Sequence, residues 1–266
     1  MRLHCLVAIS AFRRYSTYRW ATVTGVFVNS VFGVIRCYIL LALWDTNPHI
    51  GGYDATDAVT YCWLTQSLIM TTGIFGGSGV DEVATRVRTG DIVVDLYRPV
   101  NLQSWYMAAE FGRSAFSLLG RGVPPTIIGA LLFGLRFPQA PLTWLAFTAA
   151  MVLGVVVGFS IRFLVALSGF WLVDGRGMLF LINTAGTFFS GFMLPINLFP
   201  GWLADLCYAL PWVSMIQTPI DIFLGQESAF DFARGFGTAV AWAAVLLTAG
   251  HLLLARATRK VVVQGG

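Results

Sequence analysis

The sequence predicts an all-α polytopic membrane protein, because of its composition and the length of its apolar runs. Of its 266 residues, 57% are hydrophobic and only 11% are charged, whereas a soluble domain carries about 25% charged residues. Several apolar runs reach or approach the roughly 20 residues that cross a bilayer as a helix. The segments of alternating polarity that are typical of a transmembrane β-barrel do not occur in the sequence. Too few charged residues are therefore available to cover a surface in water.

One interfacial helix and six membrane spans are the expected elements. Residues 1–20 mix arginines with aromatic side chains, which favours a helix lying on the inner membrane surface. Residues 21–266 are expected to form a single six-span domain. The expected spans are residues 21–44, 58–75, 114–135, 142–164, 177–194 and 235–255. Arg121, Pro124 and Pro125 interrupt the third span, so neighbouring helices or waters must satisfy the carbonyls that the prolines leave free.

The positions of Lys and Arg predict the orientation, because basic residues collect in cytoplasmic loops. With the N-terminus in the cytoplasm, only Arg136 and Arg234 lie in outer segments and Arg36 lies within a span, which leaves 14 of the 17 basic residues inside. We therefore expect a multi-pass protein of the cell (inner or plasma) membrane, surrounded by lipid, with both termini cytoplasmic. This asymmetry explains the net charge of +4 without a nucleic-acid partner. The four cysteines are too widely spaced to predict a metal site.

The sequence contains no P-loop for nucleotide binding. That motif requires a Gly-Lys pair followed by Ser or Thr, because the lysine and the backbone amides hold the phosphates. The chain has one lysine, Lys260, which follows Arg259 and precedes Val261. We therefore expect a non-catalytic chain that binds no cofactor, with ATP and Mg²⁺ held by a separate ATPase chain if transport is driven by ATP.

A short amphipathic helix is expected in the inner loop between the second and third spans. Asp91 stands near its start, where a carboxylate stabilises the helix dipole, and Pro99 stops it. Ile92 and Leu96 form an apolar stripe. The positions expected to stay polar are Asp91, Asp95 and Arg98. Such a helix is suited to docking in a groove of another protein, and an ordinary interfacial loop is the alternative.

The stretch after the fifth span is rich in Pro, Gly, Trp and Phe and cannot form one continuous helix. We expect short outer re-entrant helices between the fifth and sixth spans, anchored by interfacial aromatic residues. Irregular backbone at membrane depth persists only where it is buried in protein or lines a cavity. The region is therefore a candidate for the translocation path or a subunit interface. Its candidate residues are Phe189, Gly191, Pro195 and Pro200.

Two motifs resemble those of the permease subunits of ABC-2 type exporters, particularly the six-span branch of about this length. Gly90–Asn101 is similar to the loop between spans two and three of that branch, and Phe188–Leu203 is similar to the outer-loop signature of the family. The resemblance extends over essentially the whole chain in span count, order and loop lengths. It implies that the chain pairs with an identical or homologous permease and binds two cytoplasmic ABC ATPase subunits.

The resemblance also implies roles for individual segments. The inner loop would be the coupling helix that receives the motion of the ATPase, and residues 1–20 would be the elbow helix beside it. The implied coupling residues are Gly90, Asp91, Asp95, Leu96, Arg98 and Pro99. The substrate would be hydrophobic or amphiphilic, as are the drugs, lipids and lipid-linked glycans that the family transports.

Several single residues are further candidates. Arg36 lies roughly 12 Å from the outer end of its span by helix rise; it either contacts substrate or a second subunit, or pairs structurally with carbonyls or water. Gly154 and Gly158 form a GxxxG motif that permits close helix packing, within the chain or at a subunit interface. Arg162 is expected to pair with Asp174. No Asp or Glu lies at the centre of a predicted span.

Two other function classes are alternatives. Gly76–Gly79 matches the short Gly-x-Ser-Gly motif of rhomboid intramembrane serine proteases, with Ser78 as nucleophile and His251 as base. Leucines follow the histidine where rhomboids carry glycines, and motifs of four residues match by chance. An ion-coupled secondary transporter would favour inverted repeats, broken helices and buried carboxylates, none of which the sequence indicates.

Overall fold

The structure, a computed structural model, describes residues 2–48, 50–75, 79–97, 99–172, 176–225 and 229–264. All regular elements among these residues are helical. The α-helices are α1 (Arg2–Ser16), α2 (Arg19–Thr46), α3 (Ala55–Thr72), α4 (Gly79–Thr89), α5 (Ile92–Leu96), α6 (Leu102–Ser117), α7 (Val123–Phe133), α8 (Pro141–Ser168), α9 (Arg176–Phe189), α10 (Gly201–Ala209), α11 (Gln217–Leu224) and α12 (Ala229–Gln264). The shorter elements are the π-helical turn η2 (Leu118–Gly122) and the 3-10 helices η1 (Ile50–Gly52), η3 (Ile196–Leu198) and η4 (Pro211–Met215).

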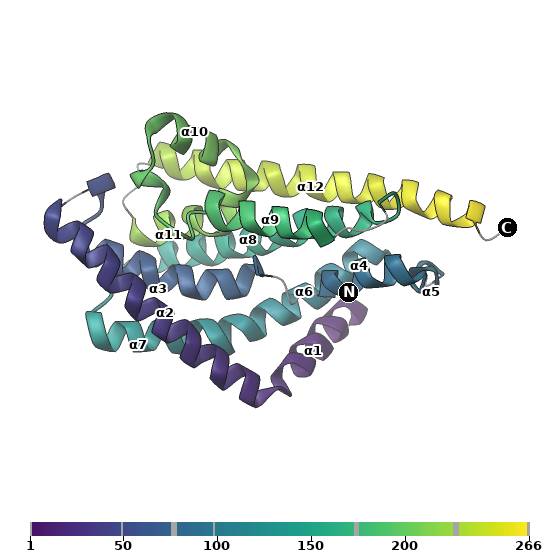
Figure 1. The fold of residues 1–266 in the computed structure, drawn as a ribbon, viewed down its shortest axis with the longest axis horizontal. Helices are drawn as coiled ribbons and strands as arrows, with labels where there is room; N and C mark the ends of the chain where they lie inside the picture. The colour runs from purple at the N-terminus through teal and green to yellow at the C-terminus, as the bar shows by residue number, and fades with distance from the viewer. Residues whose placement is uncertain are drawn as a thin grey trace.

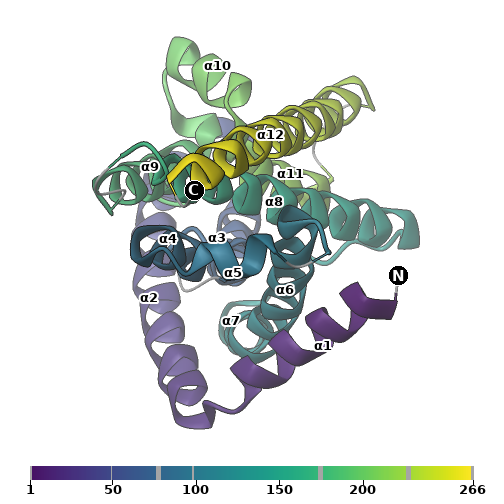
Figure 2. The ribbon, with the colours of Figure 1, turned by 90° about the vertical axis from the view of Figure 1, so that its right-hand side faces the viewer.

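The long helices lie side by side along the longest axis of the molecule (Figure 1). Helix α10 and the short elements near it lie at one end, and α4, α5 and the C-terminal end of α12 lie at the other. Helix α1 turns back from the start of α2 and lies along α6, which Figure 2 shows from the α4–α5 end. Four helical segments of the described chain are long and apolar enough to cross a membrane: α2, α6–α7, α8 and residues 231–259 of α12. A multi-pass helical membrane protein is thus confirmed.

The second and fifth expected spans correspond to shorter helices. Helix α3 has 18 residues, nearly all buried between other helices. It begins at a capping box formed by Asp54 and Asp57 and ends where Gly73 takes a φ of 71°. Helix α9 has 14 residues and ends at Phe189 rather than at the expected residue 194, because Gly191 (φ 84°) turns the chain. Residues 190–194 therefore belong to the loop that follows α9.

The third span begins earlier than expected. Its helix starts at Leu102 instead of residue 114, where the Asn101 side chain accepts a hydrogen bond from the Ser104 backbone N–H at 3.0 Å. The turn η2 joins α6 to α7 just before Pro124 and Pro125, so the prolines stand in the first turn of α7. Proline is tolerated there because the N–H groups of a first turn have no partner within the helix. The helical segment runs on to Phe133.

The core holds one large side chain in a slot between two glycines. Trp63 of α3 is fully buried. A Cβ atom added to Gly33 of α2 would lie 2.7 Å from the Trp63 ring, and one added to Gly129 of α7 would lie 2.5 Å from its Cε2 atom. Three helices therefore pack closely because neither glycine carries a side chain.

We expect Gly129→Ala to destabilise the protein by about 1–3 kcal/mol, because the added methyl group overfills the Trp63 slot. A lower thermal unfolding midpoint of the purified protein in detergent would show this. Gly237→Ala is the matched control, since a Cβ atom at this helical glycine meets nothing within 4 Å. Equal midpoints for the two variants would contradict the close packing of Trp63 against Gly129.

Candidate functional site

Helices α4 and α5 form a hairpin at one end of the bundle. Gly90 makes the turn between them with a φ of 83°, which a residue with a side chain rarely adopts. The Arg86 Nη1 atom lies 2.7 Å from the Asp95 Oδ2 atom, and the Tyr106 hydroxyl donates to the same carboxylate at 3.3 Å. Ile92 is buried against side chains of α4, α6 and α8. The hairpin is therefore fixed to the bundle from its inner side.

The side of this hairpin that faces away from the bundle is exposed. Asp91, Val94 and Tyr97 recur every three residues and thus share one face; Val94 is 62% exposed and Tyr97 is 85% exposed. The Thr89 hydroxyl donates to the Asp91 carboxylate at 2.7 Å. We call Asp91, Val94 and Tyr97 the hairpin face. Helix α5, which carries this face, lies at the end of the bundle (Figure 2).

The structure separates the predicted coupling residues. Gly90, Asp91 and Pro99 are exposed and Leu96 is half-buried. Asp95 was expected on the polar face, but it is buried and ion-paired with Arg86. The reason is that α5 spans only five residues, and the side of it that carries Asp95 faces α4 and α6. Arg98 lies outside the described residues.

Helix α1 joins the hairpin to the rest of the bundle. The Arg14 Nη1 atom lies 3.3 Å from the Glu82 Oε2 atom of α4. A cavity of about 400 Å³ lies between α1, α4 and α6. Farther along the same contact, the rings of Phe12 and Phe116 meet edge to face at 5.6 Å. Movement of the hairpin would therefore displace α1 and α6 together.

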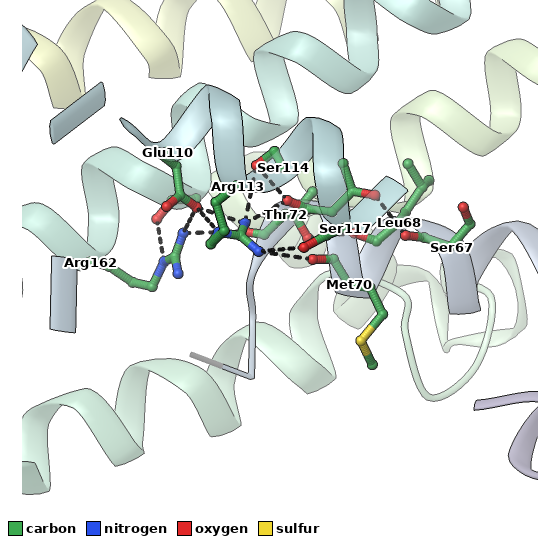
Figure 3. Close-up of polar contacts among 11 residues, drawn as sticks. Ser67, Leu68, Met70, Thr72, Glu110, Arg113, Ser114, Ser117 and Arg162 are labelled. Carbon is green, nitrogen blue, oxygen red and sulfur yellow. Dashed lines mark hydrogen bonds and ion pairs between the residues drawn. The ribbon is translucent and has the colours of Figure 1, made fainter. Parts of the chain in front are cut away.

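A buried charge cluster, Glu110, Arg113 and Arg162, lies between α6 and α8 (Figure 3). These side chains are only 1%, 4% and 2% exposed. The Glu110 Oε1 atom lies 2.7 Å from Arg113 Nη2 and 2.8 Å from Arg162 Nη2. The carboxylate thus holds two guanidinium groups that would otherwise be costly to bury.

The same arginines bind the C-terminal end of α3. Arg113 donates to the backbone carbonyls of Met70 and Thr71 at 3.1 and 2.8 Å, and Arg162 donates to that of Thr72 at 3.3 Å. These carbonyls have no partner within the helix, and positive charge is favourable at a helix C-terminus. Because α3 leads into α4, the charge cluster anchors the chain just before the hairpin to both α6 and α8.

The sequence analysis missed this cluster. With the third span expected from residue 114, Glu110 and Arg113 were placed in a loop, although their i, i+3 spacing suits a helical ion pair. Arg162 pairs with Glu110, and its expected partner Asp174 lies outside the described residues. Buried carboxylates, which the sequence did not indicate, do occur: Glu110 lies on α6, and Asp95 and Asp221 are buried on the short helices α5 and α11.

Arg36 connects α2 to the loop after α9. Its Nη2 atom donates to the backbone carbonyls of Phe192 and Met193, the second at 3.3 Å. Its guanidinium carbon lies 4.7 Å from the centre of the Phe192 ring. Backbone carbonyls, one of the partners considered for this arginine, are thus the groups that it binds. Arg36 therefore fixes the irregular segment that was predicted for the translocation path.

A buried polar network holds the rest of that segment. The Gln217 amide oxygen accepts from the Tyr61 hydroxyl at 2.6 Å and from the Ile196 N–H at 3.0 Å, and its amide nitrogen donates to Asp221 at 2.8 Å. Tyr53 donates to the same aspartate. Burial raises the pKa of Tyr53 well above its usual value, so the phenol keeps the proton that it donates. The short outer helices are therefore held at fixed positions.

The other predicted path residues surround this network. Gly191 lies against the Tyr61 hydroxyl, which donates to its carbonyl at 2.7 Å. Phe189 stacks on the Trp212 ring with centroids 5.9 Å apart. Pro195 is buried and Pro200 is exposed at the start of α10. A cavity of about 360 Å³ lies beside them, lined in part by Tyr53, Asn197, Asp205, Tyr208, Asp221 and Arg234.

Gly154 and Gly158 pack against other segments of the same chain. A Cβ atom at Gly154 would lie 2.8 Å from the Ser214 carbonyl oxygen, and one at Gly158 would lie 2.6 Å from the Met215 Cε atom. The GxxxG motif thus lets η4 approach α8. Of the protease pair, Ser78 lies outside the described residues and His251 is exposed on α12.

Comparison with known families gives one result that covers nearly the whole chain. A family model described as "ABC-2 family transporter protein" matches residues 21–265. The match includes the hairpin, the charge cluster and the buried polar network around Gln217, and it begins just after α1. No curated protein matches the chain.

Proposed function

Because the chain belongs to the ABC-2 transporter family, we propose that it is the permease subunit of an ATP-driven exporter. It binds no nucleotide itself. Two cytoplasmic ABC ATPase subunits bind ATP and Mg²⁺, and a second permease, identical or homologous, completes the path for a hydrophobic or amphiphilic substrate. The observation that carries this proposal is the α4–α5 hairpin, whose buried side is fixed by Asp95 and Ile92 while Val94 and Tyr97 are exposed.

The six spans of this permease are α2, α3, α6–α7, α8, α9 and α12, with both termini in the cytoplasm of the cell membrane. This orientation places the hairpin and α1 inside, as coupling helix and elbow helix, and α10 outside. The excess of arginine in the segments at the hairpin end supports it. The outer loop fixed by Arg36 and Gln217 then borders the exit of the path.

The proposed mechanism transmits motion through rigid contacts. Closure of the ATPase subunits displaces the hairpin face, and the Arg86–Asp95 ion pair keeps α4 and α5 moving as one piece. The charge cluster passes the displacement to α3, α6 and α8, because Arg113 and Arg162 hold the end of α3. The paired permeases then change from inner to outer access.

The hairpin face provides a direct test. We expect the double variant V94S/Y97S to retain at least five-fold less ATPase subunit when the permease is extracted gently from its host, because the variant removes the exposed apolar contacts at that end. The measurement is the amount of Walker-motif ATPase that co-purifies, identified by mass spectrometry. Trp202→Ser is the matched control, since this 72% exposed aromatic side chain lies on α10 at the opposite end. Undiminished ATPase in the double variant would contradict the proposed docking surface.

A further inference from the structure

Arg121 differs from Arg36, Arg113 and Arg162 in that its side chain has no hydrogen-bond partner among the described residues. Arg36 binds backbone carbonyls, and Arg113 and Arg162 bind Glu110. Among the described residues, no carboxylate or carbonyl accepts a hydrogen bond from the Arg121 side chain, and its Nε atom is buried without a partner. An arginine within a membrane helix is costly and usually paired. A partner from outside the chain is therefore required to satisfy it.

The backbone around Arg121 departs from a regular α-helix. The residue lies in the π-helical turn η2, and π-turns inside helices occur frequently at functional sites. The Asn29 side chain of α2 donates to the Arg121 carbonyl at 3.2 Å and to the Gln66 carbonyl of α3 at 3.3 Å. Three helices therefore fix the backbone of the turn while its guanidinium group remains without a bond.

The guanidinium group lies across a glycine of the neighbouring helix. A Cβ atom added to Gly25 of α2 would be 3.4 Å from Arg121 Nε and 3.7 Å from its Cζ atom. A larger side chain at Gly25 would occupy this space. Arg121 itself is only half-buried. The open side of Arg121 therefore faces the surroundings of the bundle.

The position along α2 indicates what those surroundings are. Gly25 lies six residues after the start of α2, which is about 9 Å along the helix axis. In the proposed orientation that end of α2 is at the inner surface, so Arg121 lies where the head groups of the inner leaflet meet the hydrocarbon. Guanidinium groups match phosphate and carboxylate oxygens in geometry and charge.

We propose that Arg121 binds the anionic head group, phosphate or carboxylate, of an amphiphile that approaches from the inner leaflet between α2 and the turn η2. This inference rests on the proposed orientation of the permease but needs no ATPase subunit. The amphiphile is either a lipid of the bilayer or the transported substrate, since both share this chemistry.

Lipid retention in nanodiscs tests the site. With equal parts of phosphatidylglycerol and phosphatidylcholine, native mass spectrometry should show at least five-fold preferential retention of phosphatidylglycerol by the wild type. We expect Arg121→Gln to bring the ratio close to one and Arg121→Lys to keep part of the preference. Gly25→Leu should also lower the ratio, although it leaves every charge in place. Arg19→Gln and Val23→Leu, nearby on α2, are the controls and should match the wild type.

The outcomes separate the possible readings. Unchanged retention in Arg121→Gln, or an equal loss in Arg19→Gln, would overturn the site, and thermal midpoints near that of the wild type show that the variants are folded. Dodecyl phosphate that displaces phosphatidylglycerol and stimulates ATP hydrolysis by the whole complex identifies the ligand as a transported anion. Phosphatidylglycerol that resists displacement identifies it as a bilayer lipid. Retention is measured on the permease without ATPase. A negative result at Arg121 therefore does not contradict the proposed transport function, and a failure of the proposed transport function does not contradict lipid binding at Arg121.

Discussion

Replacing Glu110 by glutamine should destabilise the protein more than any other charge-removing substitution proposed for this chain. The neutral amide leaves Arg113 and Arg162 buried without a counter-charge, and breaking a buried pair in this way costs about 3–5 kcal/mol. For a chain of this size that corresponds to a fall of about 10 °C in the unfolding midpoint. The measurement is thermal unfolding in detergent, together with the fraction of protein that elutes as a single folded species.

A surface carboxylate provides the matched control for Glu110. Glu82 also contacts two arginines, Arg14 and Arg86, but its side chain is 40% exposed. Exposed ion pairs contribute about 0–1 kcal/mol, so Glu82→Gln should change the midpoint little. If both variants unfold at the same temperature, the cluster is not the buried network that the distances indicate.

The location of this cluster gives it a role besides stability. The carbonyls that Arg113 and Arg162 bind are the last ones of α3, and α4 follows within a few residues. In the proposed mechanism, displacement of the hairpin relative to α6 and α8 is transmitted through these bonds.

Much of the fold was predictable because the apolar runs are long. The helices α2, α8 and α12 include the expected spans 21–44, 142–164 and 235–255; α2 and α8 are a few residues longer, and α12 extends well beyond its span at both ends. The third span was expected to begin at residue 114, whereas its helix begins at Leu102, because residues 102–113 are helical although they carry Glu110 and Arg113. That single error hid Glu110 from the search for intramembrane charges.

The site was predictable only in part, because the sequence pattern does not specify what a short helix packs against. Gly90 as a turn and Asp91 as an exposed polar residue follow from local chemistry. Whether Asp95 or Tyr97 faces outward depends on Arg86 and Tyr106, which lie on other helices. The partners of Arg36 are backbone carbonyls. Because every residue has a backbone carbonyl, the sequence does not indicate which ones Arg36 binds.

The contact of α1 with α6 depends on the absence of a side chain at Gly112. A Cβ atom there would overlap the backbone carbonyl oxygen of Ala8 and would lie 2.8 Å from its carbonyl carbon. Backbone atoms cannot rotate away as a flexible side chain does, so the whole of α1 must shift. We therefore expect Gly112→Val to separate α1 from α6, although α6 itself remains helical.

This separation is measurable apart from global stability. In Gly112→Val, limited proteolysis should cut the α1–α2 corner near Tyr18 at least ten times faster, because α1 loses its close contact, whereas the cleavage rate in Gly177→Val should match the wild type. A Cβ atom at Gly177, a glycine on α9, meets nothing within 4 Å, so this control adds the same side chain without a clash. Equal cleavage rates for the two variants would mean that α1 is held by its other contacts, such as Phe12 with Phe116. A raised rate for Gly112→Val alone would mean that α1 stays on α6 only while residue 112 has no side chain. The contact of α1 with the hairpin through Arg14 and Glu82 would then depend on that glycine.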